Sequence, residues 1–394
     1  MEIAFFSNFL NHHQLPLCEA FLAQDEVKFT FVATEPIPNE RQNMGYADIN
    51  KKYSFVLCAY ENEENLRKAE DLAKNCDLMI FGSAPQIYLE LRMAGNKLVF
   101  YFSERILKKG SWRRFIPITY KKIYNGYIRY KDKNLYVLGA SAYTSYDLKL
   151  CGFDANKCFK WGYFPRIREN YVNDLLARKS ENSVIEILYA GRLLSWKRVL
   201  DTVKAVHILL RQGVKGFRFT IIGDGEQKQA IEEYVQKYRL EQYIRLLPFM
   251  PADNVRVYMD SADIYVFSSN RHEGWGAVVN EAMDSACAMV VSHAVGSVPY
   301  LIQNGENGLV YQSGNILQLA EKLKQLIENQ NYRENLAKRA HEIIHKEWTA
   351  EIAVARLLQL YKSLVKGENA SCLFTDGVCS KAPLLKNNWL KVKE

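Results

Sequence analysis

SSNRHEGWGAVVNEAMDSACAMVVSHAVGSVPYLIQNGENGLV, residues 268–310, is the stretch that decides how this chain is organised. It follows an apolar run, residues 263–267 (DIYVF), that predicts a buried strand, and residues 277–286 have the composition of a helix. Between them, Gly274 and Gly276 allow the backbone to approach a ligand closely. A strand, a glycine-rich turn and a helix N-terminus together favour a phosphate site, because the free N–H groups of the first helical turn point at the ligand.

Two acidic residues bracket this turn. Glu273 lies before it, and Glu281 lies about one turn into the predicted helix. A carboxylate at Glu281 is within reach of hydroxyl groups on the same ligand. An anion at the helix tip with hydroxyls at a carboxylate describes a sugar nucleotide. On spacing alone, an ordinary strand–turn–helix with two solvated glutamates is the alternative.

The length and composition predict a soluble protein of two domains. The chain has 394 residues, with 48% hydrophobic and 24% charged residues and a net charge of +8. Its first residues, MEIAFFSNFL, carry no basic region of the kind that begins a signal peptide. No apolar run reaches the length of a membrane span, so we expect a cytoplasmic protein whose membrane contact, if any, is peripheral.

The eight cysteines are scattered and form no Cys-x-x-Cys pair. Reduced thiols are therefore expected, as in most cytosolic proteins. A disulfide between Cys372 and Cys379 is the alternative near the C-terminus.

Strands and helices are predicted to alternate along both halves of the chain. This alternation is typical of parallel sheets covered by helices on both faces. Residues 36–50 are predicted to be loop, residues 166–182 to cross between domains, and the tail beyond Gly367 has no clear periodicity. In the first half, strands are expected at 1–6, 28–32, 77–81, 97–102 and 135–138, and helices at 17–22, 85–93 and 140–150. In the second half, strands are expected at 185–189, 217–222 and 263–267, and helices at 198–211, 226–238, 277–286, 316–345 and 348–365. Residues 244–247 and 254–261 are expected as further elements of the same series.

Two further strand ends in the second half carry residues suited to the same ligand. Arg192 and Lys197 follow the strand at 185–189, and two cations there can neutralise a departing diphosphate. The turn Gly223-Asp224-Gly225 follows the strand at 217–222 and suits a nearby ribose or base. Open α/β sheets bind ligands where their strands end, so we expect these places to face one crevice. Taken singly, they are equally typical of surface charges and of an ordinary loop.

The motifs resemble those of a retaining glycosyltransferase of family 4. The matching stretches are AGRLLSWKR (190–198), IIGDG (221–225) and EGWGAVVNE with its continuation to NGENGLVY (273–311). The resemblance covers most of the C-terminal half and only loosely the N-terminal half. It implies an α/β protein with the GT-B fold, in which two Rossmann-like domains with doubly wound parallel sheets face a central cleft. The implied division is an acceptor domain at 1–165, a nucleotide-sugar domain at 166–345, a helix at 346–366 that crosses back onto the first domain, and a tail at 367–394.

The same resemblance assigns roles to individual residues. It implies that Arg192 and Lys197 bind the donor diphosphate, that Glu273 contacts the transferred sugar, and that Glu281 binds the ribose. Glu273, Arg192 and Lys197 are the expected catalytic residues, with Gly223 and Gly225 also at the donor. No metal and no other cofactor is implied. Backbone contacts with sugar and phosphate are implied for Gly274, Trp275, Gly276, Ala277 and Val278.

The resemblance implies retention of configuration at the anomeric carbon. The favoured route is front-face attack, in which the leaving phosphate helps to deprotonate the acceptor. Arg192 and Lys197 then stabilise the charge that builds on the diphosphate in the transition state. A double displacement needs a carboxylate nucleophile, for which Glu273 is the only obvious candidate.

The N-terminal half departs from the family pattern. Many members carry a Gly-Gly loop after the first strand, where this chain has NFLNHHQ (8–14). His12 or His13 is a candidate contact for the phosphate or the acceptor there, with helix capping or surface exposure as the alternative. A histidine found after a later strand in many members is replaced by Phe102-Ser103-Glu104-Arg105. Glu104 is a candidate for the acceptor or sugar, with an exposed loop acid as the alternative.

Residues 108–133 form a basic segment with interleaved aromatic residues. It holds nine Lys/Arg residues against one acid, and Ile123, Tyr124, Tyr127 and Ile128 share one helical face. Such segments often lie on anionic membranes. The alternative is a solvated helix whose aromatic stripe packs into the core, and no nucleic-acid fold signature accompanies the charge. The expected membrane-facing cations are Lys108, Lys109, Arg113, Arg114, Lys121 and Lys122.

The sequence therefore predicts an enzyme that moves a sugar from a UDP- or GDP-sugar to a saccharide or lipid-linked saccharide. By analogy, its setting is bacterial surface polysaccharide synthesis on the cytoplasmic face of the inner membrane. A sugar-nucleotide epimerase, an inverting transferase and a membrane-docked scaffold without catalysis are the rival functions.

Overall fold

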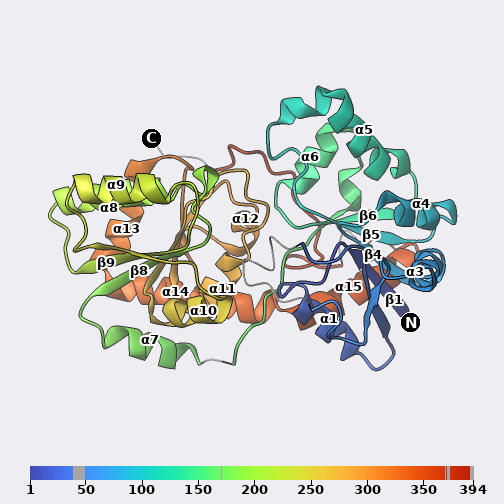
Figure 1. The fold of residues 1–394 in the computed structure, drawn as a ribbon, viewed down its shortest axis with the longest axis horizontal. Coiled ribbons are helices and arrows are strands. Elements are labelled where there is room, and N and C mark those ends of the chain that lie inside the picture. The colour runs from blue at the N-terminus through green and yellow to red at the C-terminus, as the bar shows by residue number, and fades with distance from the viewer. Residues whose placement is uncertain (39–48, 170, 369, 371–372, 391–394) are drawn as a thin grey trace. The chain divides into compact units, whose positions relative to one another are not determined.

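The computed structural model describes residues 1–38, 49–169, 171–368, 370 and 373–390 (Figure 1). Internal contacts divide the chain into two compact units. Unit 1 comprises Met1–Arg166 and Trp348–Lys386, and unit 2 comprises Ile167–Glu347 and Asn387–Glu394. Each unit is built on its own parallel sheet. Among the described residues, no helix combines the length and apolar character needed to cross a bilayer.

The sheet of unit 1 has the strand order β3-β2-β1-β4-β5-β6-β7. β1 lies between β2 and β4, with Ile3 level with Phe29 on β2 and with Leu78 on β4. Strands buried on both faces need continuous apolar runs, and LMIF in β4 is one. The strands are β1 (Glu2–Ser7), β2 (Lys28–Ala33), β3 (Val56–Cys58), β4 (Leu78–Phe81), β5 (Val99–Ser103), β6 (Leu135–Gly139) and β7 (Cys158–Lys160).

Helices cover this sheet and include one from the far end of the chain. α15 (Ala350–Val365) packs against α1 (Leu15–Leu22), and the Tyr361 hydroxyl donates to the carbonyl of Asp77 at 3.3 Å. The other helices are α3 (Glu63–Asn75), α4 (Gln86–Ala94), α5 (Pro117–Gly126) and α6 (Thr144–Leu150). Short 3₁₀ turns are η1 (Ser111–Phe115), η2 (Ile128–Tyr130) and η3 (Ala155–Lys157).

The C-terminal tail covers the open edge of β7. The Lys160 amide donates to the carbonyl of Ser380 at 2.7 Å, and the Cys379 amide donates to the carbonyl of Lys160 at 2.9 Å. The Ala382 amide donates to the carbonyl of Cys158 at 2.9 Å. An uncovered edge strand invites pairing with other chains, so the tail protects this one.

The sheet of unit 2 has the strand order β10-β9-β8-β11-β12-β13. Its strands are β8 (Ile185–Ala190), β9 (Phe217–Ile222), β10 (Ile244–Leu247), β11 (Ile264–Phe267), β12 (Ala288–Ser292) and β13 (Leu309–Tyr311). Its helices are α7 (Val172–Ser180), α8 (Val199–Arg211), α9 (Lys228–Lys237), α10 (Ala252–Ser261), α11 (Val278–Asp284), α12 (Val298–Leu301), α13 (Ile316–Glu328) and α14 (Gln330–Glu347), with the 3₁₀ turn η4 (Ser195–Lys197).

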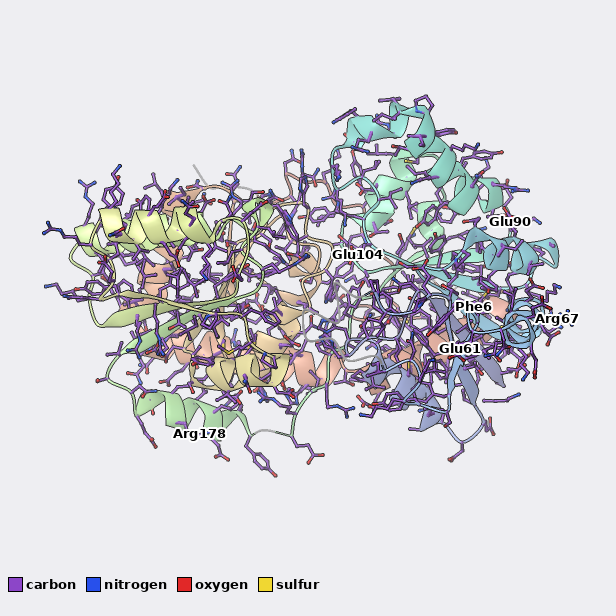
Figure 2. The ribbon with its side chains drawn as sticks, viewed as in Figure 1. Phe6, Glu61, Arg67, Glu90, Glu104 and Arg178 are labelled. Carbon is purple, nitrogen blue, oxygen red and sulfur yellow. The ribbon has the colours of Figure 1, made fainter. Side chains whose placement is uncertain are left out.

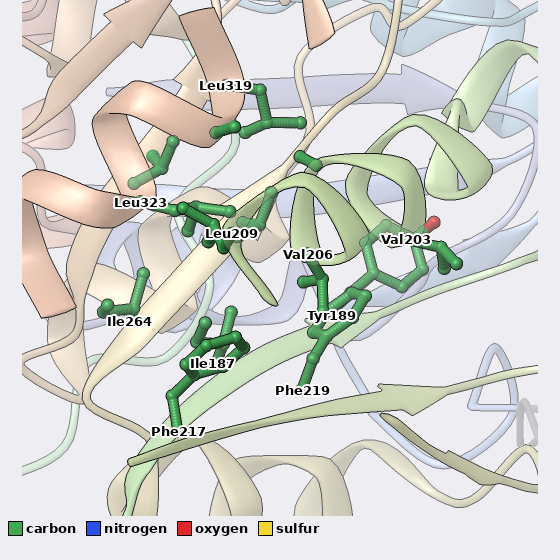
Figure 3. Packing of buried hydrophobic residues seen from close by; sticks show 14 of the residues in the cluster. Ile187, Tyr189, Val203, Val206, Leu209, Phe217, Phe219, Ile264, Leu319 and Leu323 are labelled. Atoms are coloured by element: carbon green, nitrogen blue, oxygen red, sulfur yellow. The ribbon is translucent and has the colours of Figure 1, made fainter. Parts of the chain in front are cut away.

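The core of unit 2 fixes where its strands end. Val203, Val206 and Leu209 form the buried stripe of α8 and pack on Tyr189 and Phe219 of the sheet (Figure 3). Leu319 and Leu323 of α13 close the same layer (Figure 3). These side chains are almost fully buried, and burial of each contributes about 1.5–3 kcal/mol. The layer is well enough packed to hold the loops after β8, β9 and β11 in one place.

The predicted α/β architecture with two doubly wound parallel sheets is confirmed, as is the last helix packing on the first unit. The structure differs from the sequence prediction in several elements. The single helix expected at 316–345 is two helices that meet at Asn329. Residues 166–182, which include the boundary between the two units, also hold α7, whose Leu175 and Lys179 are buried. The segment around α3 was not predicted at all, because α3 is mostly polar and buries only Ala69 and Ala73.

The described cysteines are free. Cys372, the alternative disulfide partner of Cys379, lies outside the described residues, as does most of the loop expected at 36–50.

Candidate functional site

The loops after β8 and β11 are tied together in unit 2. The Ser268 hydroxyl donates to the carbonyl of Lys197 at 2.7 Å, and the Asn270 amide donates to the carbonyl of Trp196 at 2.9 Å. The two strands are neighbours in the sheet, with Ile187 level with Ile264. The topology therefore brings the cationic and the acidic stretches of the sequence together at the carboxyl ends of these two strands.

Lys197 and Glu273 form an ion pair at the carboxyl ends of β8 and β11. The Lys197 Nζ donates to Oε2 of Glu273, which also accepts from the Ser269 hydroxyl at 2.8 Å. Both side chains are 12% exposed, so they are shielded from bulk water but still accessible. The ammonium group also lies 4.5 Å from the ring centre of Trp196 and 5.2 Å from that of Phe267. Burial of this kind strengthens the pair relative to one at the surface.

Arg192 is exposed on the loop that follows β8. Its backbone carbonyl accepts from the Tyr189 hydroxyl at 3.1 Å, which fixes the loop while the guanidinium group faces solvent. The sequence prediction that Arg192 and Lys197 follow the same strand end is met, although only Lys197 is paired with Glu273.

Gly223 and Gly225 let two loops approach each other. A Cβ at Gly223 would lie 2.0 Å from the carbonyl oxygen of Gly191, and one at Gly225 would lie 2.7 Å from that of Leu193. The Leu193 amide donates to the carbonyl of Asp224 at 2.7 Å. The direct role of these glycines is therefore to hold the Arg192 loop in place, which the sequence prediction of a ribose or base contact did not include.

The glycine-rich turn before α11 is also fixed by packing. Gly276 has φ of +86°, and a Cβ there would lie 2.5 Å from the ring of Phe267. The Trp275 indole is 1% exposed and donates from Nε1 to Oδ1 of Asn280 at 2.9 Å. The Trp275 side chain is thus part of the core, and only its backbone remains for a ligand. Gly274 is buried, and Ala277 and Val278 are partly exposed.

Glu281 lies on α11, one turn after the glycines. It is partly exposed, and its surroundings raise the pKa of its carboxyl, mainly through desolvation and further through the negative charge of Asp284. Arg256 and Arg168 oppose that shift. A desolvated carboxylate gains from hydroxyl donors that replace its lost water.

His13 and Glu104 both contact Tyr163 in unit 1, and His12 lies beside His13. The ring centres of His12 and His13 are 3.8 Å apart, and those of His13 and Tyr163 are 6.3 Å apart. The Tyr163 hydroxyl donates to Oε1 of Glu104 at 3.2 Å (Glu104 is labelled in Figure 2). Desolvation, with a smaller effect of His12, lowers the pKa of His13 to about 3, so its ring is neutral at pH 7.

The loop that carries Glu104 is anchored by a buried ion pair. Arg105 Nη2 donates to Oδ1 of Asp147 at 3.1 Å, and the Leu107 amide donates to Oδ2 at 3.0 Å. Both side chains of the pair are 3% exposed. Breaking such a pair is strongly destabilising, so the position of Glu104 is firmly set.

The basic segment divides its apolar residues between the core and the surface. Ile123 and Tyr127 are buried, so the predicted helical face packs largely into unit 1. A different set is exposed, with Trp112 at 61%, Phe115 at 73% and Ile118 at 68%. The cations predicted to face a membrane lie around them, partly or fully exposed: Lys108, Lys109, Arg113, Arg114, Lys121 and Lys122.

Two residues of these clusters were missed in the sequence. Ser269 supports Glu273, and Tyr163 links His13 with Glu104. Both follow strands, β11 and β7, and that position was the available signal.

Comparison with known proteins shows that the C-terminal half is similar to group 1 glycosyltransferases. Residues 175–343 match the family model of glycosyl transferases group 1. The capsular polysaccharide biosynthesis glycosyltransferase CapM of Staphylococcus aureus is 22% identical over 236 residues, which are 60% of this chain and 57% of that protein. The uncharacterized glycosyltransferase MJ1178 of Methanocaldococcus jannaschii is 34% identical over 149 residues, 38% of this chain and 41% of that protein. The chain thus spans about half the length of the curated relatives it matches.

Solved structures share the fold over nearly the whole chain. HepE (Alr3699) of Anabaena, solved in complex with UDP, superposes with a TM-score of 0.67 at 17% identity, covering 93% of this chain and all of that one. A sucrose-phosphate synthase of Thermosynechococcus elongatus gives a TM-score of 0.66 at 18% identity, again covering 93% of this chain. At these identities the likeness establishes the fold.

Proposed function

We propose that the chain transfers a sugar from a UDP- or GDP-sugar to a saccharide or lipid-linked saccharide acceptor. The match of residues 175–343 to the family model of glycosyl transferases group 1 supports this proposal. We further propose that the anomeric configuration is retained. The observation that carries the proposal is the Lys197–Glu273 ion pair at the joined ends of β8 and β11. In this proposal, Lys197 is a shielded cation for the phosphate, and the neighbouring Glu273 is a carboxylate for sugar hydroxyls.

In the proposed reaction, the bond between the anomeric carbon and the diphosphate oxygen breaks while the acceptor oxygen bonds to the same face. The acceptor proton passes to the leaving phosphate, so the products are the glycosylated acceptor and a nucleoside diphosphate. Lys197 and Arg192 stabilise the negative charge that grows on the diphosphate. Glu273 holds sugar hydroxyls and orients Lys197 before the donor arrives.

We propose that this transfer needs no metal ion at the diphosphate. Two cationic side chains and the amides of the turn before α11 supply the positive field that a divalent ion would otherwise provide. Glu281 is assigned to the ribose, because its desolvated carboxyl lies on α11, about one helical turn after the glycine-rich loop. On unit 1, we assign His13, Tyr163 and Glu104 to hydroxyls of the acceptor or the sugar.

A thermal-shift screen over UDP-, GDP- and ADP-sugars tests the donor class. A bound donor raises the melting temperature by mass action. The selected donor is then incubated with and without saccharide acceptors, and the configuration of the product is read by NMR. The transferase proposal fails if the protein neither binds nor hydrolyses any nucleotide sugar.

The rival functions give different products. An epimerase converts the donor in the absence of any acceptor, and an inverting transferase gives the opposite anomer. A scaffold binds no donor. The presence of the whole expected set of donor residues, Arg192, Lys197, Glu273 and Glu281, argues against the scaffold.

We also propose a cytoplasmic protein that docks peripherally on an anionic membrane through η1 and the start of α5 (teal in Figure 1). Trp112, Phe115 and Ile118 are the most exposed apolar side chains of this segment, and cations surround them. Apolar side chains inserted at the headgroup level gain by burial, and each nearby cation contributes about 1 kcal/mol. A membrane at this surface would present a lipid-linked acceptor to unit 1.

Vesicle sedimentation tests this docking. The wild-type chain should sediment with phosphatidylglycerol vesicles. Binding should be lost in the double variant Trp112→Ala with Phe115→Ala, and likewise in Lys121→Glu with Lys122→Glu. Tyr171 and Leu317, which are 80% and 71% exposed outside the basic segment, provide matched Ala controls that should bind normally. Equal binding by all variants would refute membrane docking by this segment.

A further inference from the structure

Two histidines and an aspartate meet on the side of α11 that faces α14 (both labelled in Figure 1). His341 and His345 are one turn apart on α14, with ring centres 3.9 Å apart and planes inclined by 23°. Nε2 of His345 lies 2.8 Å from Oδ1 of Asp284, the last residue of α11. Each residue offers one ligand atom, and these atoms all lie within 4.8 Å of one another. We name this set the Asp284 cluster.

The Asp284 cluster contains a buried nitrogen without a hydrogen-bond partner. His341 is 6% exposed, and its Nε2 contacts no donor or acceptor among the described residues. Buried polar atoms are nearly always paired, because an unpaired one has lost its water and gained nothing. The orphaned nitrogen belongs to one of the residues whose ligand atoms converge, so a shared ligand would satisfy it.

Asp284 is held in a way that turns one oxygen toward the histidines. Its carboxylate is fully buried, and Arg256 and the Arg168 Nε donate to Oδ2. Oδ1 faces His345 and the more distant backbone amide of Arg168, at 3.4 Å. Carboxylates that ligate metals are commonly fixed by hydrogen bonds to their other oxygen. Asp260 shares the charge of Arg168, which limits how far the guanidinium groups repel a cation.

We propose that the Asp284 cluster binds a transition-metal ion of the Zn²⁺ and Co²⁺ class, through His341, His345 and Asp284. Two imidazoles and a carboxylate suit such ions rather than Mg²⁺ or Ca²⁺. A tetrahedral site with bonds of 2.0–2.2 Å separates its ligands by about 3.4 Å, so small side-chain movements suffice. His345 is 26% exposed, which provides the route of entry and leaves the fourth position to water.

The proposed ion site uses none of the residues assigned to the sugar transfer, although Asp284 and Glu281 lie on the same helix and interact electrostatically. It joins α11 to α14, so a bound ion would stiffen unit 2 close to the residue assigned to the ribose. The two arginines on Asp284 predict weaker binding than at a site without them.

Cobalt titration of the chelator-treated full chain tests the proposal. One Co²⁺ per chain should bind with the visible bands of a tetrahedral N/O site, and Zn²⁺ should displace it. His341→Phe keeps the stacked aromatic packing but removes the nitrogen, and should weaken binding by about tenfold or more, as should His345→Ala. His207 lies on α8 and is hydrogen-bonded to the Tyr234 hydroxyl, so His207→Ala should bind Co²⁺ as the wild type does.

Two outcomes would overturn the proposal. One is the absence of tetrahedral cobalt bands from a chain shown to be folded by circular dichroism. The other is equal affinity in the wild type, His341→Phe and His207→Ala, which would place the ion elsewhere. Because the measurement needs no nucleotide sugar, its result is independent of the proposed transferase activity.

Discussion

At the scale of single residues, the site depends on charges that are matched before any donor arrives. Lys197 is paired with Glu273, which Ser269 also supports. In the proposed complex, a diphosphate shares Lys197 with Glu273, and the other carboxylate oxygen of Glu273 accepts from sugar hydroxyls. Both residue types and their spacing were predictable from the sequence. Their pairing was not, because it depends on the neighbouring positions of β8 and β11 in the sheet.

Glu281 gives donor binding a dependence on pH. Desolvation raises the pKa of its carboxyl, and only the carboxylate accepts hydrogen bonds from both ribose hydroxyls. As the pH falls through this raised pKa, the group becomes protonated and nucleotide affinity should fall. Glu281→Gln should bind more weakly at neutral pH and lose this dependence. Calorimetric titration across pH checks both, and an unchanged pH profile in the variant would contradict the assignment.

Gly223 should be the least replaceable glycine near the site. Gly223→Ala places a Cβ 2.0 Å from the carbonyl oxygen of Gly191 and should lower the free energy of unfolding by about 2–4 kcal/mol. Gly216→Ala is the matched control, since its φ of +79° is also positive but no atom lies within 4 Å of the new Cβ. It should lose only about 1–2 kcal/mol. Urea denaturation compares them, and equal losses would exclude the close approach as the cause.

At the scale of elements, sequence patterns predicted what is buried and periodic. Continuous apolar runs identified β4 and β11, and the stripe of Val203, Val206 and Leu209 identified α8. α3 was missed because only two alanines face the core. Its signals were local, with Asn62 capping the helix and ion pairs from Glu63 to Arg67 and from Glu64 to Lys68.

The tail is the element that sequence patterns could not predict. It is held by backbone hydrogen bonds to β7, which leave no periodic trace in the side chains. Truncation after Lys366 should expose the edge of β7 and speed hydrogen exchange at the Lys160 amide by at least about tenfold, while the amides of β9 in unit 2 serve as the control. Unchanged exchange at Lys160 would show that the tail does not protect this edge.

At the scale of the whole molecule, both units repeat one plan of parallel strands with functional residues where the strands end. That plan follows from the alternation of apolar runs and helices, so the fold class was predictable. The residues proposed for the donor site come from the motifs in 190–198 and 273–281, and their role stays a prediction. The His13–Tyr163–Glu104 grouping was not predictable, because its three members come from distant parts of unit 1 and share no motif.

The most direct test of the central claim is the affinity of the nucleotide sugar selected by thermal shift, measured calorimetrically for wild type, Lys197→Ala and the exposed control Lys237→Ala. Loss of a charged hydrogen bond to the diphosphate should weaken binding by about tenfold to a hundredfold in Lys197→Ala and leave Lys237→Ala unchanged. Equal affinity in all three proteins would contradict the assignment of the donor site to the joined ends of β8 and β11.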